Sequence, residues 1–410
     1  MRDSGFFPSA TLWPHDSIGD RLTGLHHTAA LSRTLSGERR SALRDGPARL
    51  DVLVSQALGE HTDSRLVPRG GQRTPGSGRA DGHAVGPARG RNPDGTPRFD
   101  QAVSSGSYLW WYVDGLSDCG THAITIIAFV GSVFSPYYAW ARERAARQGT
   151  TVDPENFCAI NVALYTPGRK RWTMTERSRA SIERSATHFR VGPSALEWNG
   201  SELIIRIDER SAPIPVAVRG TVRLSAPRWF DWQWPLDPSG RHRWGPLAPA
   251  SRIAVNFDSP GIQWQGHGYL DSNEGDEPIE ARYDEWDWSR ATLADGSSAV
   301  VYDLRTRDGG EHLIAKRFLS DGRVSDFDPG PRQALARTGW RIGRSIRSEA
   351  HGPKPRIART LEDTPFYVRS LAESTVDGEQ VLSVHETLNG PRLRSALVRL
   401  MLPWRMPRLR

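Results

Sequence analysis

A strict alternation of apolar and polar residues recurs after residue 98, and it constrains the fold more than any other feature of this sequence. In Pro215–Ser225 (PVAVRGTVRLS), valine and leucine alternate with arginine and threonine. Ser201–Asp208 and Arg252–Phe257 follow the same pattern. A period of two places every second side chain on one face of an extended strand, so these segments are predicted to be half-buried strands.

Turn signals separate these strands. Two alternating runs, Ala299–Thr306 and Glu311–Phe318, flank an Asp-Gly pair and together have the signature of a β-hairpin. The one clear helical segment is Ala139–Gln148, which is rich in alanine, arginine and glutamate. Many short strands with little helix predict an all-β chain built as an antiparallel sandwich or barrel.

About 290 residues follow residue 98 before the final tail, which is large for one such unit, so we expect two antiparallel barrels in tandem. Prolines and small residues cluster at Gly245–Ser251, where a boundary is expected. Wide barrels can enclose long apolar ligands. The expected division is an N-terminal extension, a first barrel, a second barrel and a tail, at residues 1–98, 99–247, 248–390 and 391–410.

The N-terminal extension has a low-complexity composition. Residues Gly70–Arg98 are dominated by glycine, proline and arginine, which bury too little apolar surface to offset the entropy of ordering, so we expect disorder there. A start-site extension upstream of the native protein is one interpretation of this region.

The formal net charge of +7 comes from the two ends of the chain. Residues 1–98 hold 14 arginines against 10 acidic residues, and the last twenty residues hold six arginines and no acid. Residues 99–390 have 34 basic and 37 acidic residues. This slightly acidic body argues against binding of nucleic acid.

Two features bear on contact with a membrane. The most apolar run, Ala123–Phe134, has 12 residues, fewer than the roughly 20 needed to span a bilayer. The tail mixes leucine, valine, methionine and tryptophan with arginine, a composition suited to an anionic membrane surface, although a final helix packed on the body explains it equally well. No secretory signal stands at the N-terminus. We therefore expect a location on the cytoplasmic side, peripheral to the inner membrane.

Common catalytic and metal motifs fail to match. Asp271 and Asn273 could begin a calcium loop, but Gly275, Asp276 and Arg282 occupy its fifth, sixth and twelfth positions. The sequence contains neither a nucleophile elbow nor a nucleotide-binding loop, and its histidines and two cysteines lack metal-ligand spacing. We expect no cofactor and no metal.

What remains is a set of acidic residues beside aromatic rings. In a strand, alternation would put Tyr269 and Asp271 on one face, and His242 and Trp244 on one face of another strand. Taken singly, Asp271 would more often cap a turn than act as a catalytic acid, and Trp244 would more often be a core residue than a site residue. If both faces meet, they surround an apolar volume with proton-handling groups. In Glu285–Arg290 we expect the two tryptophans to be buried and the acidic residues to be solvated.

A buried carboxyl surrounded by aromatic rings has a specific chemical use. Desolvation disfavours its ionised form, so it stays protonated near neutral pH and can act as an acid. The π faces can then stabilise a developing cation, by roughly 0.5–2 kcal/mol for each ring. Protonation of an unactivated alkene requires this combination.

Several longer segments carry a resemblance to a known family. The motifs YLWWYVD, GSVFSPYYAWAR and GYLDSNEGDEP, with NVALYTPGRKRWTMTER and GRHRWGPLAP, are similar to the acyclic carotenoid 1,2-hydratases of phototrophic bacteria, also called hydroxyneurosporene synthases. The resemblance covers roughly residues 98–390. It implies two lipocalin-like barrels and a hydro-lyase that adds water, without a cofactor, to the C1–C2 double bond of neurosporene, lycopene or related acyclic carotenoids. It also implies a place in the spheroidene or spirilloxanthin pathway of photosynthetic bacteria.

The matched segments contain Asp271, His242, Tyr269 and Trp244. We expect protonated Asp271 to deliver a proton to C2, Trp244 and Tyr269 to stabilise the cation at C1, and His242 to position or deprotonate the attacking water. Five further aromatic residues are expected to line the entrance or the polyene tunnel, although structural packing explains them equally well: Trp110, Trp111, Tyr137, Tyr138 and Trp140.

Three acidic residues after Asp271, namely Glu274, Asp276 and Glu277, are expected to form a solvated turn. Two rival functions stay open. A non-enzymatic carrier of lipid or carotenoid would need the pocket but no perturbed aspartate. A glycoside-acting enzyme would need two pocket carboxyls at a fixed separation in a wet, polar cleft.

Overall fold

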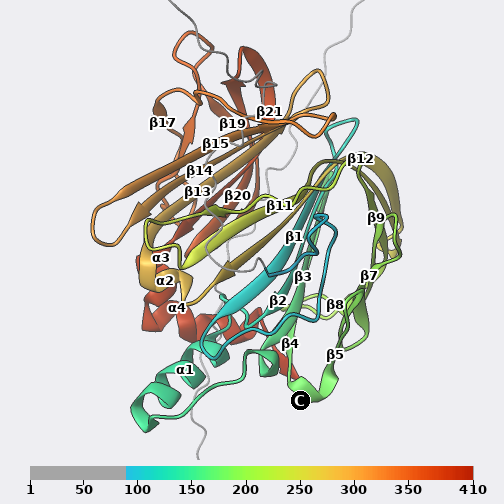
Figure 1. Ribbon diagram of the computed structural model, residues 1–410, viewed down its shortest axis with the longest axis vertical. Coiled ribbons are helices and arrows are strands. Elements are labelled where there is room, and N and C mark those ends of the chain that lie inside the picture. The colour runs from blue at the N-terminus through green and yellow to red at the C-terminus, as the bar shows by residue number, and fades with distance from the viewer. Residues whose placement is uncertain (1–88, 410) are drawn as a thin grey trace, which may run out of the picture. The chain divides into compact units, whose positions relative to one another are not determined.

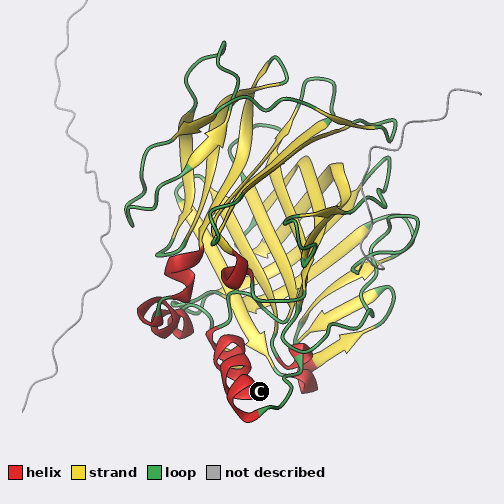
Figure 2. Cartoon of the chain, turned by 60° about the vertical axis from the view of Figure 1, so that its left-hand side comes forward, coloured by secondary structure: helices red, strands yellow, loops and turns green. Residues whose placement is uncertain are grey.

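The computed structural model describes residues 89–409, which form two large sheets with the helices gathered at one end of them (Figure 1). Strand pairing among these residues is antiparallel except for the parallel contact of β22 (Arg408–Leu409) with β4 (Arg169–Arg177), and Figure 2 shows the strands and helices from a second side. The prediction of an all-β chain with little helix is confirmed for these residues.

The first sheet has thirteen strands, in the order β22-β4-β3-β2-β1-β12-β11-β9-β8-β7-β6-β5, with β10 paired to β11. The strands predicted from alternation are β8, β9 and part of β11. The bounds are β1 Tyr108–Ser117, β2 Ala123–Val130, β3 Cys158–Thr166, β4 Arg169–Arg177, β5 Ile182–Arg184, β6 His188–Val191, β7 Ser194–Trp198, β8 Leu203–Arg210, β9 Ala217–Ser225, β10 Trp234–Pro235, β11 His242–Ser259, β12 Ile262–Gly275 and β22 Arg408–Leu409.

This sheet curls around a core of its own (Figure 1). The alternate residues of β1, β2 and β3 that face inward meet the inward residues of β8, β9 and β11. Val218, Val222 and Leu224 of β9 lie in this core, as the alternation in Pro215–Ser225 predicts. The other face of β1–β3 and of β12 is therefore free to pack against the second sheet.

The second sheet has seven strands, in the order β16-β15-β14-β13-β21-β20-β19, and the two-stranded ribbon β17–β18 lies beside it. The predicted hairpin is β14 paired with β15. The bounds are β13 Tyr283–Thr292, β14 Ser298–Thr306, β15 Glu311–Phe318, β16 Val324–Asp326, β17 Arg332–Ala334, β18 Ser345–Arg347, β19 Arg356–Asp363, β20 Tyr367–Val376 and β21 Glu379–Asn389.

The helices are short apart from α1. Ser135 caps α1, because its side chain accepts a hydrogen bond from the backbone nitrogen of Tyr138, and Gly149 ends it in the left-handed conformation. The bounds are α1 Pro136–Gln148, α2 Ile279–Arg282, α3 Gly390–Arg394 and α4 Ala396–Met401, with single 3-10 turns η1 Pro154–Asn156, η2 Arg179–Ser181 and η3 Leu402–Trp404.

Each of the two large sheets runs from one edge strand to another. The boundary expected between residues 247 and 248 falls inside β11, and the change of sheet comes later, between Gly275 and Tyr283. One apolar cluster continues across the facing sides of both sheets. The division into two domains stays a prediction.

Three expectations about particular residues need correction or lie outside the structure. Residues 89–98, expected to be disordered, form a turn closed by an Arg91–Pro97 bridge and held by contacts of Arg89 with Glu274. Asp287, expected to be solvated, is buried because Ser345 and Thr387 donate hydrogen bonds to its carboxylate. The predictions for residues 1–88 lie outside the described residues.

Candidate active site

The candidate acid lies between the two sheets and not inside the curl of the first one. Asp271 and Tyr269 project from β12 into the apolar cluster that joins the sheets, beside Trp288 of β13 and Tyr302 of β14. Because β12 pairs with β1 on one side and β11 on the other, Asp271 stands opposite Tyr112 and Pro246.

Asp271 is 2 % exposed, and its two carboxyl oxygens differ in their hydrogen-bond partners. Its Oδ2 accepts hydrogen bonds from the Tyr269 hydroxyl at 2.7 Å and from the Trp244 indole nitrogen at 3.0 Å. Its Oδ1 is buried and has no hydrogen-bond partner among residues 89–409. The sequence-based pairing of Tyr269, Asp271 and Trp244 around one point is thus confirmed in its geometry.

This environment changes the acidity of the group. Burial raises the pKa of Asp271 to about 8, and the donors Tyr269 and Trp244 offset only part of that rise. The carboxylates of Asp114 and Glu386 raise the pKa further, because a second negative charge nearby is unfavourable. Asp271 is therefore mostly protonated at neutral pH, with Oδ1 as the oxygen that can carry the proton.

Aromatic rings surround this carboxyl group. The Tyr269 ring lies 5.3 Å from that of Trp288, and the Trp244 ring lies 5.0 Å from that of Tyr302. Tyr112 packs edge-on against both Tyr269 and Trp288, at 6.1 and 5.2 Å. Ring faces at these distances can stabilise a cation formed among them.

A cavity of about 50 Å³ lies beside this cluster, several times the roughly 10–15 Å³ that one water requires by the same measure. Tyr112, the neighbour of Asp271 across the strands, is part of its wall. Aromatic and aliphatic side chains form the rest, together with one carboxylate: Trp110, Ile127, Phe129, Phe134, Ile279, Trp286, Tyr367, Leu388 and Glu386.

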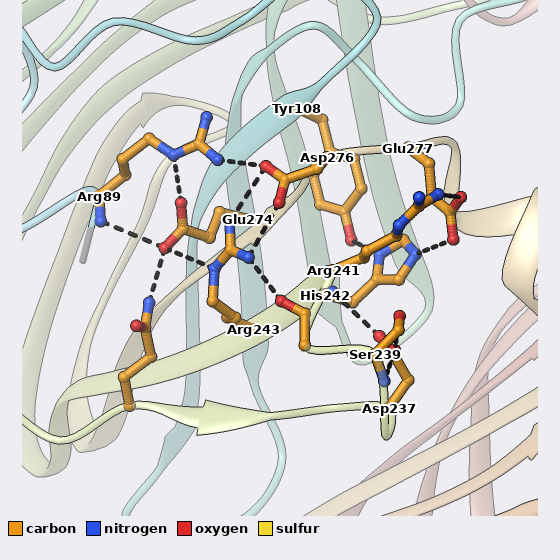
Figure 3. A network of polar contacts seen from close by, with 12 residues as sticks. Arg89, Tyr108, Asp237, Ser239, Arg241, His242, Arg243, Glu274, Asp276 and Glu277 are labelled. Carbon is orange, nitrogen blue, oxygen red and sulfur yellow. Dashed lines mark hydrogen bonds and ion pairs between the residues drawn. The ribbon is translucent and has the colours of Figure 1, made fainter. Parts of the chain in front are cut away.

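The contacts of His242 are with groups other than Asp271 and its two hydrogen-bond donors. Its Nδ1 lies 2.7 Å from the Tyr108 hydroxyl, its Nε2 lies 3.6 Å from Glu277, and its backbone nitrogen donates to Asp237 (Figure 3). A β-carbon at Gly275 would overlap the Tyr108 ring, so this close packing depends on glycine. Burial lowers the pKa of His242 to about 4.

Within residues 89–409, no hydrogen bond joins His242 to Asp271 or its donors, and His242 does not line the cavity. Its assignment to the attacking water stays a prediction.

The acidic residues after Asp271 fall into two groups. Glu274 is buried and its carboxylate contacts Arg89, Arg243 and Gln233, so the expectation of a solvated turn is wrong for this residue (Figure 3). Asp276 is partly exposed, as expected, although it too contacts Arg243. Arginines distant in sequence therefore allow a carboxylate to be buried in this segment.

The five expected tunnel residues are dispersed. Trp110 alone lines the cavity. Trp111 points to the other face of β1, into the core of the first sheet, and donates to the Gly90 carbonyl. Tyr138 is buried and donates to the Ser107 carbonyl, while Tyr137 and Trp140 pack against each other on α1.

The sequence analysis missed several groups at this site. Arg290 forms a buried ion pair with Asp114, and its guanidinium lies 6.0 Å from the Tyr269 ring. Tyr112 follows Trp110 by two residues in the quoted YLWWYVD motif, so the same alternation could have found it. Glu386 lies 115 positions beyond Asp271 on the other sheet, and no local pattern identifies it.

Comparison with known proteins gives a consistent family. The family model for the carotenoid hydratase CrtC matches residues 126–410. The chain is 54 % identical over 408 residues to an acyclic carotenoid 1,2-hydratase from Rubrivivax gelatinosus, and 44 % identical over 410 residues to that from Thiocapsa roseopersicina. Both alignments cover 100 % of each chain, so the similarity extends beyond residues 98–390 to the N-terminal region.

A third relative, the acyclic carotenoid 1,2-hydratase of Cereibacter sphaeroides, is 39 % identical over 284 residues, which cover 69 % of this chain and 98 % of the relative. A family match over most of the chain and relatives of this similarity leave one assignment. The chain belongs to the carotenoid hydratase CrtC family.

Proposed function

We propose that this protein adds water to the C1–C2 double bond at the ψ-end of acyclic carotenoids such as neurosporene and lycopene, as a hydro-lyase that uses no cofactor. The observation that carries the proposal is the Asp271 carboxyl group, which is buried, mostly protonated at neutral pH and surrounded by aromatic rings. The relatives named above are called acyclic carotenoid 1,2-hydratases, which supports this substrate class.

The first chemical step is a proton transfer. Asp271 gives the proton on Oδ1 to C2, and the electron pair of the double bond forms the new C–H bond. The positive charge then rests on C1, where three carbon substituents stabilise it. Tyr269 and Trp244 already donate hydrogen bonds to Oδ2, so the carboxylate left behind is stabilised without further rearrangement.

The second step is the capture of the cation. The rings of Tyr269, Trp244, Trp288 and Tyr112 stabilise the charge while the oxygen of a water molecule bonds to C1. Loss of one proton from that water gives the tertiary alcohol. The reaction consumes one water and neither oxidises nor reduces the substrate, so an acid, a base and water are chemically sufficient.

The rival functions fit these observations less well. A glycoside-acting enzyme needs a polar, wet cleft, whereas the cavity wall is aromatic and aliphatic with a single carboxylate. A carotenoid carrier has no use for a protonated Asp271, so it predicts that Asp271→Asn leaves function unchanged.

Purified protein incubated with lycopene in lipid vesicles, without added cofactor, tests the proposal. In ¹⁸O-labelled water the expected product is heavier than lycopene by one labelled water. Asp271→Asn is expected to abolish it, whereas Asp258→Asn, an exposed aspartate on β11, is expected to keep it. Bound but unchanged lycopene would favour the carrier. If lycopene is neither converted nor bound, the substrate class is refuted.

We also propose that the protein contacts the membrane through an apolar patch at its C-terminus, on the cytoplasmic side of the inner membrane. Among residues 89–409, no helix has the length and apolar character needed to cross a bilayer. Leu397, Leu400 and Trp404, spaced three and four residues apart, are 69, 65 and 78 % exposed. Val398 and Leu402 of the same segment are buried in the cluster between the sheets.

The arginines of this tail have a different role from the one that composition suggested. Arg399 pairs with Glu143, and Arg408 pairs with Glu176. Arg394 and Arg405 are paired as well, whereas Arg392 donates to backbone carbonyls. Most of the described tail arginines are thus paired with acidic residues, and the tail offers leucine and tryptophan more than free positive charge. The proposed contact is therefore mainly apolar, and it should depend only weakly on salt.

Sedimentation with vesicles tests this contact. Replacing Leu397, Leu400 and Trp404 together by serine is expected to lower vesicle binding at least tenfold, with uncharged and anionic lipid alike. Ile214→Ser is the matched control, because Ile214 is equally exposed but lies in the loop between β8 and β9. Unchanged binding by the triple variant would refute the patch, and binding that disappears in salt would favour an electrostatic contact.

A further inference from the structure

The cavity lined by Tyr112 holds a carboxyl group whose surroundings differ from those of Asp271, which is not itself among the lining residues. Of its lining residues, Glu386 on β21 alone carries a carboxylate, and the side chain is 13 % exposed. Its wall is otherwise aromatic and aliphatic apart from the hydroxyls of Tyr112 and Tyr367, so Glu386 is the charged partner for a small molecule that enters the cavity.

The Glu386 carboxylate is firmly held. Arg369 Nε donates to Oε1 at 2.7 Å, and the Tyr112 hydroxyl donates to the same oxygen at 2.6 Å. Arg369 is itself buried and donates to the Tyr165 hydroxyl at 2.9 Å. The carboxylate is therefore held in place by one cation and one hydroxyl. Both of these donors bind Oε1, so Oε2 is the oxygen that a water in the cavity would approach, and the Tyr367 hydroxyl acts on the same carboxylate.

Tyr112 connects this carboxylate to the candidate acid. Its backbone stands opposite Asp271 in the pairing of β1 with β12, and its hydroxyl reaches Glu386. Asp271 is held by neutral donors, whereas Glu386 is held by a cation. Two neighbouring carboxyl groups in such different environments can act as an acid and a base in the same reaction.

We propose that Glu386 is the catalytic base that takes the proton from the attacking water, with Arg369 and Tyr112 as its positioning residues. The proposal rests on the proposed hydration. It moves this step from His242, whose ring contacts Tyr108, to a group in the cavity wall.

The atoms balance as follows. A lone pair of the water oxygen forms the bond to C1, one O–H bond of that water breaks, and its proton passes to Oε2 of Glu386. Asp271 has already given one proton to C2. Transfer of one proton from Glu386 to Asp271 through solvent restores both groups, and the net change is the addition of one water to the substrate.

Glu386→Gln is the first test, because the glutamine oxygen can still accept from Tyr112 and Arg369 while its amide cannot take up a proton. We expect hydration of lycopene to fall by about 100-fold or more, within the usual range for loss of a general base. The matched control is Glu373→Gln on the adjacent strand β20, an exposed residue paired with Arg356, which should retain wild-type turnover.

Rescue by a second carboxylate separates a base from a structural residue. Glu386→Asp, which retains a carboxylate, should be at least tenfold more active than Glu386→Gln, although glutamine matches glutamate more closely in size. The rate of the wild type is expected to fall at alkaline pH as Asp271 ionises, and both variants should keep this alkaline limb.

The outcomes distinguish this proposal from the hydration itself. If the wild type forms no alcohol, the proposed function fails. If the wild type hydrates lycopene and Glu386→Gln does so within threefold of its rate, the base is another group. Equal rates for Glu386→Gln and Glu386→Asp would also overturn the role of Glu386.

Discussion

Replacing Asp271 with asparagine should change the way the stability of the protein depends on pH. In the folded protein the pKa of Asp271 is raised to about 8 by burial, against an ordinary value of 3.8 for aspartate. Between these two values the unfolded chain releases a proton that the folded protein keeps. Ionisation therefore favours the unfolded state increasingly as pH rises.

The size of the effect follows from the width of this window. Each pH unit inside it lowers the free energy of unfolding by about 1.4 kcal/mol through this one group. From pH 5 to pH 7 the wild type should therefore lose about 2.7 kcal/mol relative to Asp271→Asn, and above a pH of about 8 the difference should become constant. Other titrating groups occur in both proteins and cancel in the comparison.

Urea unfolding followed by tryptophan fluorescence at pH 5, 6 and 7 measures this difference. Any fixed effect of the asparagine amide shifts all three values equally, so the slope carries the information. Asp258→Asn is the control and should follow the wild type at every pH. If the difference in free energy of unfolding between Asp271→Asn and the wild type changes by less than about 0.5 kcal/mol from pH 5 to pH 7, a protonated Asp271 is refuted.

Three further predictions concern neighbouring groups. Trp244→Phe keeps the ring but removes one hydrogen bond to Asp271, so hydration should fall about tenfold and the alkaline limb of the pH–rate profile should move to higher pH; an unmoved limb would contradict this. Arg290→Met leaves the buried Asp114 carboxylate unpaired and should lower the free energy of unfolding by about 3–5 kcal/mol, as measured by urea, whereas a loss under 1 kcal/mol would show that the pair is unimportant. Cys119 is exposed, and hydrogen bonds from Ser117 and other neighbours lower its pKa to about 6, so iodoacetamide at pH 7 should modify it first, as peptide mass mapping would show.

Local periodicity predicted a large part of this structure. Alternation in β9 and β11 placed each side chain on its correct face, because a period of two is a direct consequence of strand geometry. Alternation also put Tyr269 and Asp271 on one face, and His242 and Trp244 on one face of another strand. The structure joins Trp244 to Tyr269 and Asp271 by hydrogen bonds, whereas the pairing of the two strands that brings them together could not be read from alternation.

Groups that depend on distant partners could not be predicted in this way. Glu274 and Asp287 are buried because Arg89 and Ser345, far away in sequence, approach them. Glu386 reaches the site from the second sheet, and its importance depends on how the two sheets face each other. The interior expected to hold the ligand was that of a barrel, whereas the candidate acid lies between two sheets, which strand patterns alone do not determine.

The location of the proton that Asp271 donates tests the central claim most directly. Wild-type protein and Asp271→Asn are incubated with lycopene in D₂O, and the alcohol is recovered, washed in ordinary water and examined by NMR and mass spectrometry. We predict one deuterium at C2 for each hydrated end in the wild type and no product from Asp271→Asn. Product formed by Asp271→Asn at a rate near that of the wild type, or deuterium at a carbon other than C2, would contradict the account.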